Sequence, residues 1–86
     1  MGFFSKLFSS KPKATDAAQY GWEDYGSVHG QPRSRLFIKR YSVRGENRVA
    51  QVILNGDGVF QIILSDGIYD LPACKSWEEL DQYLPG

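Results

Sequence analysis

The residue types that perform catalysis are few in this sequence, and they are not spaced for a shared task. His29 is the only histidine and Cys74 the only cysteine among the 86 residues. Neither a Cys–His pair nor a Ser–His–Asp arrangement can therefore be assigned by spacing. Cys74 lies just before Ser76, the expected start of a helix, and the dipole of a helix can lower the pKa of a nearby thiol. A lone cysteine is nevertheless more often a small, half-buried packing residue than a reactive one. We expect a non-enzyme without a cofactor.

The acidic residues do not follow a metal-binding pattern. Asp57 and Asp66 each precede a glycine, and Asp-Gly pairs are typical of turns. The segment "NGDG" lacks the regular acidic spacing and the distal glutamate of an EF-hand loop. We therefore expect no metal site.

Cations and aromatic rings are interleaved in "RSRLFIKRYSV" and just after it. Single-stranded nucleic acid can use such a surface, because phosphates pair with cations while bases stack on rings. The alternation of residue types predicts a half-buried strand, with Leu36 and Ile38 on one side and the residues between and around them facing outward. The nucleic-acid site expected as the alternative function consists of Arg35, Phe37, Lys39, Arg40, Tyr41, Arg44 and Arg48.

Charge is uneven along the chain, although the formal net charge is zero. Residues 31–48 carry six basic residues against one acidic residue, and residues 49–86 carry one basic residue against six acidic ones. This asymmetry indicates either a basic binding face or two segments that neutralise each other when the sheet forms. The second interpretation is favoured.

Apolar residues are concentrated at the beginning of the sequence, in "MGFFSKLFSSKPK". On a helix, Phe3, Phe4, Leu7 and Phe8 would fall on adjoining turns while Lys6 points elsewhere. An apolar stripe beside basic residues is typical of a helix that lies on a membrane surface or docks in a partner's groove. A third interpretation is that the stripe folds back onto the protein's own sheet. A lone cysteine favours a reducing compartment, so we expect a cytoplasmic protein, peripheral to a membrane if the stripe binds lipid.

The chain length allows one domain. Residues 1–32 are expected to be a mostly irregular arm, with a short amphipathic segment and a linker, because glycines and a proline are closely spaced in "YGWEDYGSVHGQP". Residues 33–86 are expected to form a small α+β domain. Its architecture would be an antiparallel meander of three to four strands with a short C-terminal helix packed on one face.

Turn chemistry predicts the register of the central hairpin. A type I turn across "NGDG", followed by Gly58 in the left-handed conformation, gives a three-residue loop. One face of the hairpin then becomes wholly apolar, and a slip of one residue would mix Gln61 into it. The predicted opposed pairs are Leu54 with Phe60, Val52 with Ile62, and Ala50 with Leu64.

The segment "SWEELDQYL" carries the pattern of a capped helix. Ser76 is followed three residues later by Glu79, which is a capping-box arrangement with acids in the first turn. Trp77, Leu80 and Leu84 are spaced to share one face of this helix. We expect that face to pack on the apolar face of the hairpin.

The opposite face of the hairpin mixes valine and isoleucine with two glutamines. Such a face is too apolar to be fully solvated and too polar for a closed core, so we expect another surface to cover it. The main prediction is a small protein-interaction module of the adaptor or inhibitor type. A variant of this prediction is that the module binds its partner at a membrane surface. The expected partner or membrane site consists of Phe3, Phe4, Leu7, Phe8, Val49, Ile53, Val59 and Ile63.

Overall fold

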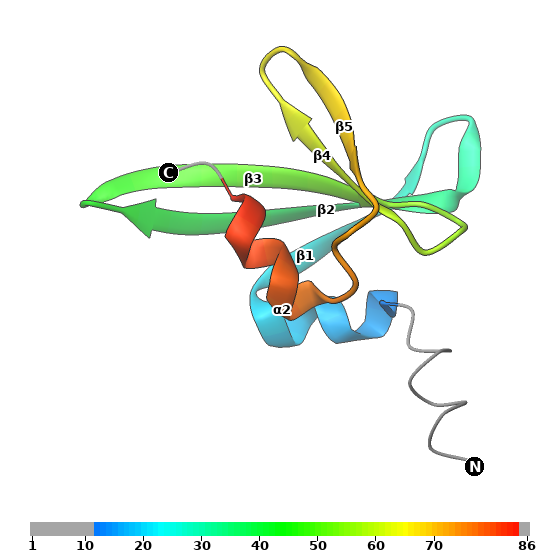
Figure 1. The fold of residues 1–86 in the computed structure, drawn as a ribbon, viewed down its shortest axis with the longest axis horizontal. Coiled ribbons are helices and arrows are strands. Elements are labelled where there is room, and N and C mark those ends of the chain that lie inside the picture. Colours follow the sequence, from blue (N-terminus) through cyan, green and yellow to red (C-terminus); the bar gives the residue numbers. More distant parts are fainter. Residues whose placement is uncertain (1–11, 85–86) are drawn as a thin grey trace.

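The computed structural model describes residues 12–84, which form a five-stranded antiparallel meander followed by a short helix (Figure 1). The elements are the 3-10 helix η1 (Ala14–Tyr20), the strands β1 (Trp22–Val28), β2 (Gln31–Val43), β3 (Glu46–Leu54), β4 (Phe60–Leu64) and β5 (Gly67–Leu71), the helix α2 (Trp77–Leu80) and the 3-10 helix η2 (Asp81–Tyr83). Strand order in the sheet equals chain order. The expected antiparallel meander with a short C-terminal helix is confirmed, but the sheet has five strands where three to four were expected.

The sheet contains a strand that the sequence interpretation assigned to a linker. Residues 14–28 form η1 and β1, so the folded unit begins well before Arg33. The glycines there mark boundaries and a bulge. Gly21 (φ 86°) ends η1, Gly26 (φ 91°) lies where the β1–β2 register shifts, and Gly30 (φ 79°) lies in the following turn. Close glycine spacing here reflects short elements rather than irregular chain.

The β3–β4 hairpin has the predicted loop. Gly58 has a φ of 82°, and the Asn55 N–H donates to the carbonyl of Val59 at 3.0 Å. Two predicted pairs, Leu54 with Phe60 and Val52 with Ile62, are present. The ladder ends with Gln51 opposite Ile63, one pair short of the predicted Ala50 and Leu64.

The side assigned to β2 was wrong. Phe37 lies opposite Val52 and is 0% exposed, so it faces the core, and Leu36 and Ile38 face away from it. The register follows from a two-residue loop at residues 44–45, in which both residues have positive φ, 53° and 81°. This is the type I′ pattern of a tight hairpin.

Four aromatic side chains form the centre of the core. The ring of Trp77 lies 4.8 Å from those of Phe37 and Phe60, in edge-to-face geometry, and 6.0 Å from that of Trp22. Such arrangements add to the stabilisation from apolar burial. The Trp77 Nε1–H also donates to the carbonyl of Lys13 at 2.8 Å, which ties α2 to the chain entering η1.

The expected cap holds the beginning of α2. The Ser76 hydroxyl accepts from the Glu79 N–H at 3.1 Å, and the Glu79 carboxylate accepts from the Lys75 N–H at 3.3 Å. Trp77 and Leu80 are buried in the core. A helix of four residues has little stability of its own, so the cap and the buried side chains define it.

Candidate interaction surfaces

The sheet has two unlike faces, which we call the core face and the outer face. The core face lies under η1 and α2, whose buried residues belong to the same cluster as Phe37 and Phe60. Because directly opposed residues in a sheet share a face, the register defines the outer face as well. Its first row is Ile38, Gln51, Ile63 and Ile68, and its second row is Leu36, Ile53, Gln61 and Asp70.

The middle of the outer face is apolar and largely shielded by its own neighbours. Ile53 is only 7% exposed, yet it is the one buried hydrophobic residue in the described chain that does not belong to the core cluster. Leu36, Ile38 and Ile63 are half-buried, and Ile68 at the sheet margin is 56% exposed. Among residues 12–84, the helical segments pack on the core face and leave this one open.

The sheet brings together part of the predicted partner site. Ile53 and Ile63 lie in adjacent rows of the outer face. Val59 is half-buried beside the loop, and Val49, 57% exposed, lies further along β3. The structure adds residues that the sequence interpretation missed, namely Leu36, Ile38 and Ile68. The arm residues Phe3, Phe4, Leu7 and Phe8 lie outside the described residues.

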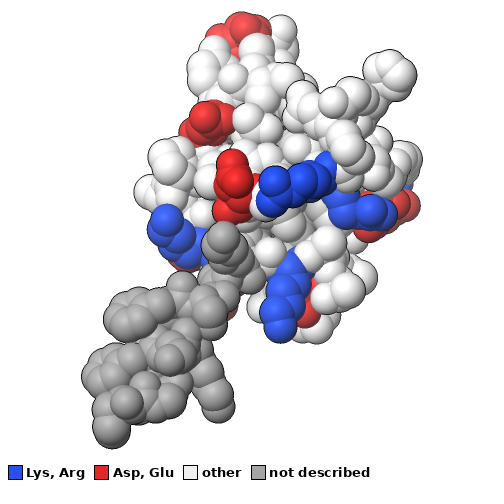
Figure 2. All heavy atoms as spheres, turned by 90° about the vertical axis from the view of Figure 1, so that its right-hand side faces the viewer, with Lys and Arg blue, Asp and Glu red and all other residues white. Residues whose placement is uncertain are grey.

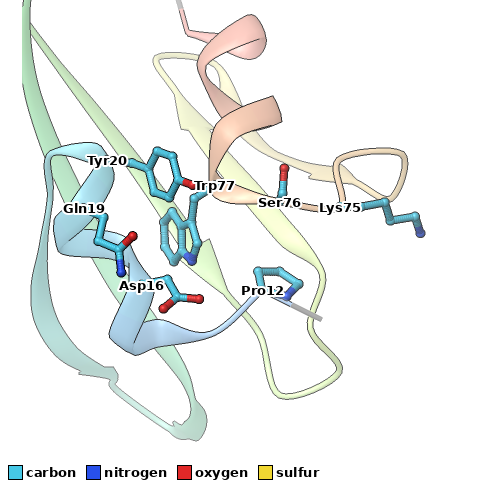
Figure 3. A pocket seen from close by; sticks show the side chains of 7 residues that line it. All are labelled: Pro12, Asp16, Gln19, Tyr20, Lys75, Ser76 and Trp77. Carbon is cyan, nitrogen blue, oxygen red and sulfur yellow. The ribbon is translucent and has the colours of Figure 1, made fainter. Parts of the chain in front are cut away.

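The described chain begins on the core side of the sheet. Pro12 and Trp77 line the same hollow, of about 270 Å³, between η1 and the start of α2 (Figure 3). Asp16, Gln19 and Tyr20 line it from η1, and Lys75 and Ser76 from the segment before α2. The described chain therefore enters η1 beside Trp77, on the core face.

The structure brings together only part of the predicted nucleic-acid site, because Arg40, Tyr41 and Arg48 line one hollow of about 630 Å³ at the β2–β3 hairpin and the other residues lie elsewhere. Phe37 is buried and so cannot stack on a base, and the register puts Arg35, Lys39 and Tyr41 on the core face as well. Arg40 is on the outer face, whereas Arg44 occupies the hairpin tip. Arg48, opposite Tyr41, returns to the core face.

Most of the basic side chains are engaged by the protein itself. Arg35 pairs with Asp24 at 3.0 Å, Arg40 with Glu23 at 2.6 Å, Lys39 with Asp81 at 2.9 Å and Arg48 with Glu46 at 3.6 Å. Arg33 donates to the carbonyl of Gly56 at 2.9 Å. On the side drawn in Figure 2, Lys and Arg atoms lie in separate groups with acidic atoms near them. The favoured interpretation, neutralisation of one segment by the other, is correct only in part, because among residues 12–84 just the Lys39–Asp81 pair joins the basic segment to the acidic one.

The pairs on β1 also affect proton binding. Burial by itself would raise the pKa of Asp24. Hydrogen bonds from Arg35 and from the Gly26 N–H, together with the positive charge of Arg35, have the larger combined effect. The pKa of Asp24 therefore lies below its ordinary value of 3.8. A hydrogen bond to Tyr25 and the charge of Glu23 raise the pKa of Arg40. The Asp24 carboxylate and the Arg40 guanidinium are therefore charged at neutral pH.

The residues singled out for chemistry lie apart. Cys74 is buried, and burial raises the pKa of its thiol, which is opposite to the lowering that a reactive cysteine needs. His29 lies in the exposed turn between β1 and β2. Within residues 12–84, no three His, Cys, Asp or Glu side chains are grouped so as to hold a metal ion. The helices of this region are all too short or too polar to cross a membrane.

No match to this chain was found among protein-family models, curated proteins or solved structures. The outer face is the face of the sheet that no helical segment among residues 12–84 covers.

Proposed function

We propose that this chain is a small, non-enzymatic protein-interaction module, of the adaptor or inhibitor type, that binds a protein partner through its outer face. The observation that carries the proposal is the group of aliphatic side chains around Ile53 on the outer face, over which no described element lies. A contiguous apolar patch on a small protein is typical of an interaction site. Covering it removes apolar area from water, which is favourable by roughly 25 cal/mol per Å².

The polar residues of this face favour a protein partner over lipid. Gln51 and Gln61 alternate with the isoleucines, and the Gln61 amide donates to the Asp70 carboxylate at 2.7 Å. A protein partner can offer hydrogen-bond groups to such side chains, whereas hydrocarbon cannot. The Arg40–Glu23 ion pair at the margin resembles the polar rim that surrounds the apolar centre of many interfaces.

The apolar arm is a second contact in this proposal. Replacing both Phe4 and Phe8 with Ser should weaken binding, because each buried ring contributes about 2 kcal/mol of transfer energy, while the stability of the sheet stays within about 0.5 kcal/mol. Denaturation, partner binding and liposome sedimentation should be measured on the same double variant. A loss of stability well above that limit would instead indicate that the arm packs on the sheet. A loss of liposome binding alone would assign the arm to a membrane.

The partner can be identified with a photoreactive residue at position 63. Benzoylphenylalanine at Ile63 should crosslink to a protein partner in an extract of the source cells, and the crosslinked protein is then purified and titrated. The matched control carries the same group at Tyr83, which is exposed on η2. Equal crosslinking from both positions, or from the control alone, would contradict binding through the outer face. A complex that weakens steeply with salt and contains nucleic acid would favour the alternative function.

A further inference from the structure

The two edges of the sheet differ in how they are protected against pairing with another strand. β1 has two register shifts, a left-handed glycine at Gly26 and the charged residues Glu23 and Asp24. Bulges and charges are standard means of blocking an edge. β5 pairs with β4 over its whole length without a shift, and no element among the described residues pairs with its other side.

The register identifies which backbone groups of β5 are free. In an antiparallel ladder, residues direct their N–H and C=O groups alternately to one neighbour and to the other. Val59 bonds to Asn55 across the β3–β4 loop, so by alternation Ile62 directs its groups to β5, where it faces Tyr69. The groups of Ile68 and Asp70, on either side of Tyr69, therefore point away from the sheet.

We propose that two copies of this chain pair through β5, antiparallel, about a two-fold axis at Tyr69. Ile68 then faces Asp70 of the second copy, and the same pair repeats across the axis. Each Ile68–Asp70 pair forms two backbone hydrogen bonds. The outward N–H and C=O groups of both residues are therefore hydrogen-bonded in both copies. The two five-stranded sheets become one continuous sheet.

The exposed side chains of β5 fit this register. Tyr69 is 44% exposed and meets Tyr69 of the second copy at the axis, in the closely spaced position of a pair without backbone hydrogen bonds. Ile68 is 56% exposed and is covered by the second strand. The two Asp70 carboxylates lie diagonally rather than opposite each other, and each accepts from its own Gln61.

The pairing is expected to be weak. Five residues at an edge bury less area than a standard interface, so the contact belongs to the transient class, with a dissociation constant on the order of 0.1 mM. It involves the edge of β5, and it does not depend on the outer-face proposal. The outer face stays open in the paired form.

The test uses two substitutions of opposite charge at position 68. In the proposed register, Ile68→Asp puts a carboxylate opposite Asp70 of the second copy, and Ile68→Lys puts an ammonium there. Both variants lose the same isoleucine, so a difference between them reports the cross-strand neighbour. In sedimentation of the full chain between about 10 µM and 1 mM, we expect dimerisation to be at least tenfold weaker in the Asp variant than in the Lys variant, with a smaller difference at high salt.

Amide hydrogen exchange on the unsubstituted chain gives an independent measurement. The Tyr69 amide should exchange slowly at both ends of the concentration range, because it bonds to β4. The Ile68 and Asp70 amides should exchange fast in dilute solution and at least threefold more slowly near 1 mM. A monomer at every concentration would overturn the proposal. Equal dimerisation of the two variants, or exchange at Ile68 and Asp70 that does not respond to concentration, would also overturn it.

Discussion

The two faces of the sheet are both rich in apolar residues but differ in the kind of side chain. The core face carries the rings of Trp22, Phe37 and Phe60, which reach out to meet Trp77 of α2. The outer face carries branched aliphatic residues alternating with amides, and nothing described covers it. Large rings can bridge to a covering helix, whereas short side chains leave a flatter surface. Apolar content alone therefore does not separate the face that packs in the core from the face that no described element covers.

The largest expected contrast is between Phe60→Ala on the core face and Ile63→Ala on the outer face. Phe60 is 0% exposed, so its truncation should cost about 3 kcal/mol or more and unfold much of a domain this small. Because Ile63 is only half-buried, Ile63→Ala should lower the free energy of unfolding by about 1 kcal/mol or less. Chemical denaturation measures both values, and equal losses would remove the distinction between the faces.

The two buried tryptophans should differ by a hydrogen bond. Trp77 donates to the carbonyl of Lys13, whereas the Nε1 of Trp22 is buried without a partner among the described residues. Both Trp→Phe changes leave a comparable void, but only Trp77→Phe loses a bond. It should be more destabilising by about 1 kcal/mol. Thermal or chemical unfolding of the two variants gives the difference, and the reverse order would show that the bond to Lys13 contributes little.

The cap of α2 should contribute less to stability than the aromatic residues of the core face. Ser76→Ala removes the oxygen that accepts from the Glu79 N–H and should cost on the order of 1 kcal/mol. Ser76→Thr, which keeps a capping hydroxyl, serves as the matched control and should recover most of the loss. Unchanged stability of the alanine variant would mean that burial of Trp77 and Leu80 defines the helix without the cap.

The smallest expected effect concerns the Asp24–Arg35 pair at the β1 edge. The folded-state pKa of Asp24 lies below 3.8, so its contribution is present above about pH 4 and is lost as the pH falls through the lowered pKa. Both side chains are over one-third exposed, which limits the contribution to a few tenths of a kcal/mol. Asp24→Asn should therefore lower stability slightly at pH 7, and the difference should vanish in acid. A difference that grows in acid would contradict the direction of the pKa shift.

Local chemistry predicted the features that depend on a few neighbouring residues. The left-handed Gly58 determined the β3–β4 register, and Ser76 with Glu79 determined the start of α2. The orientation of β2 was missed, although the two-residue loop at 44–45 implies it, because that loop places Phe37 opposite Val52. With this register, the aliphatic residues Leu36 and Ile38 could have been assigned to the outer face.

Features that depend on contacts between distant parts of the chain could not be predicted from the local sequence. Trp22 lies in a segment without clear alternation, and it is buried by Trp77, more than fifty residues later. The pairing of Lys39 with Asp81 likewise joins distant parts of the chain. No local pattern distinguishes β1 from a linker, because its core contact forms only when α2 packs on the sheet.

Binding through the outer face is tested most directly by the affinity of the purified crosslinked partner for two charge variants. Ile63→Glu puts a carboxylate in the outer face, and Tyr83→Glu puts the same group on η2. We expect Ile63→Glu to weaken binding at least tenfold, because an apolar contact worth more than about 1.4 kcal/mol is lost, while Tyr83→Glu changes it less than about threefold. Both variants must retain the unfolding midpoint of the parent chain to within a few degrees. Unchanged affinity of the folded Ile63→Glu variant would contradict binding through the outer face.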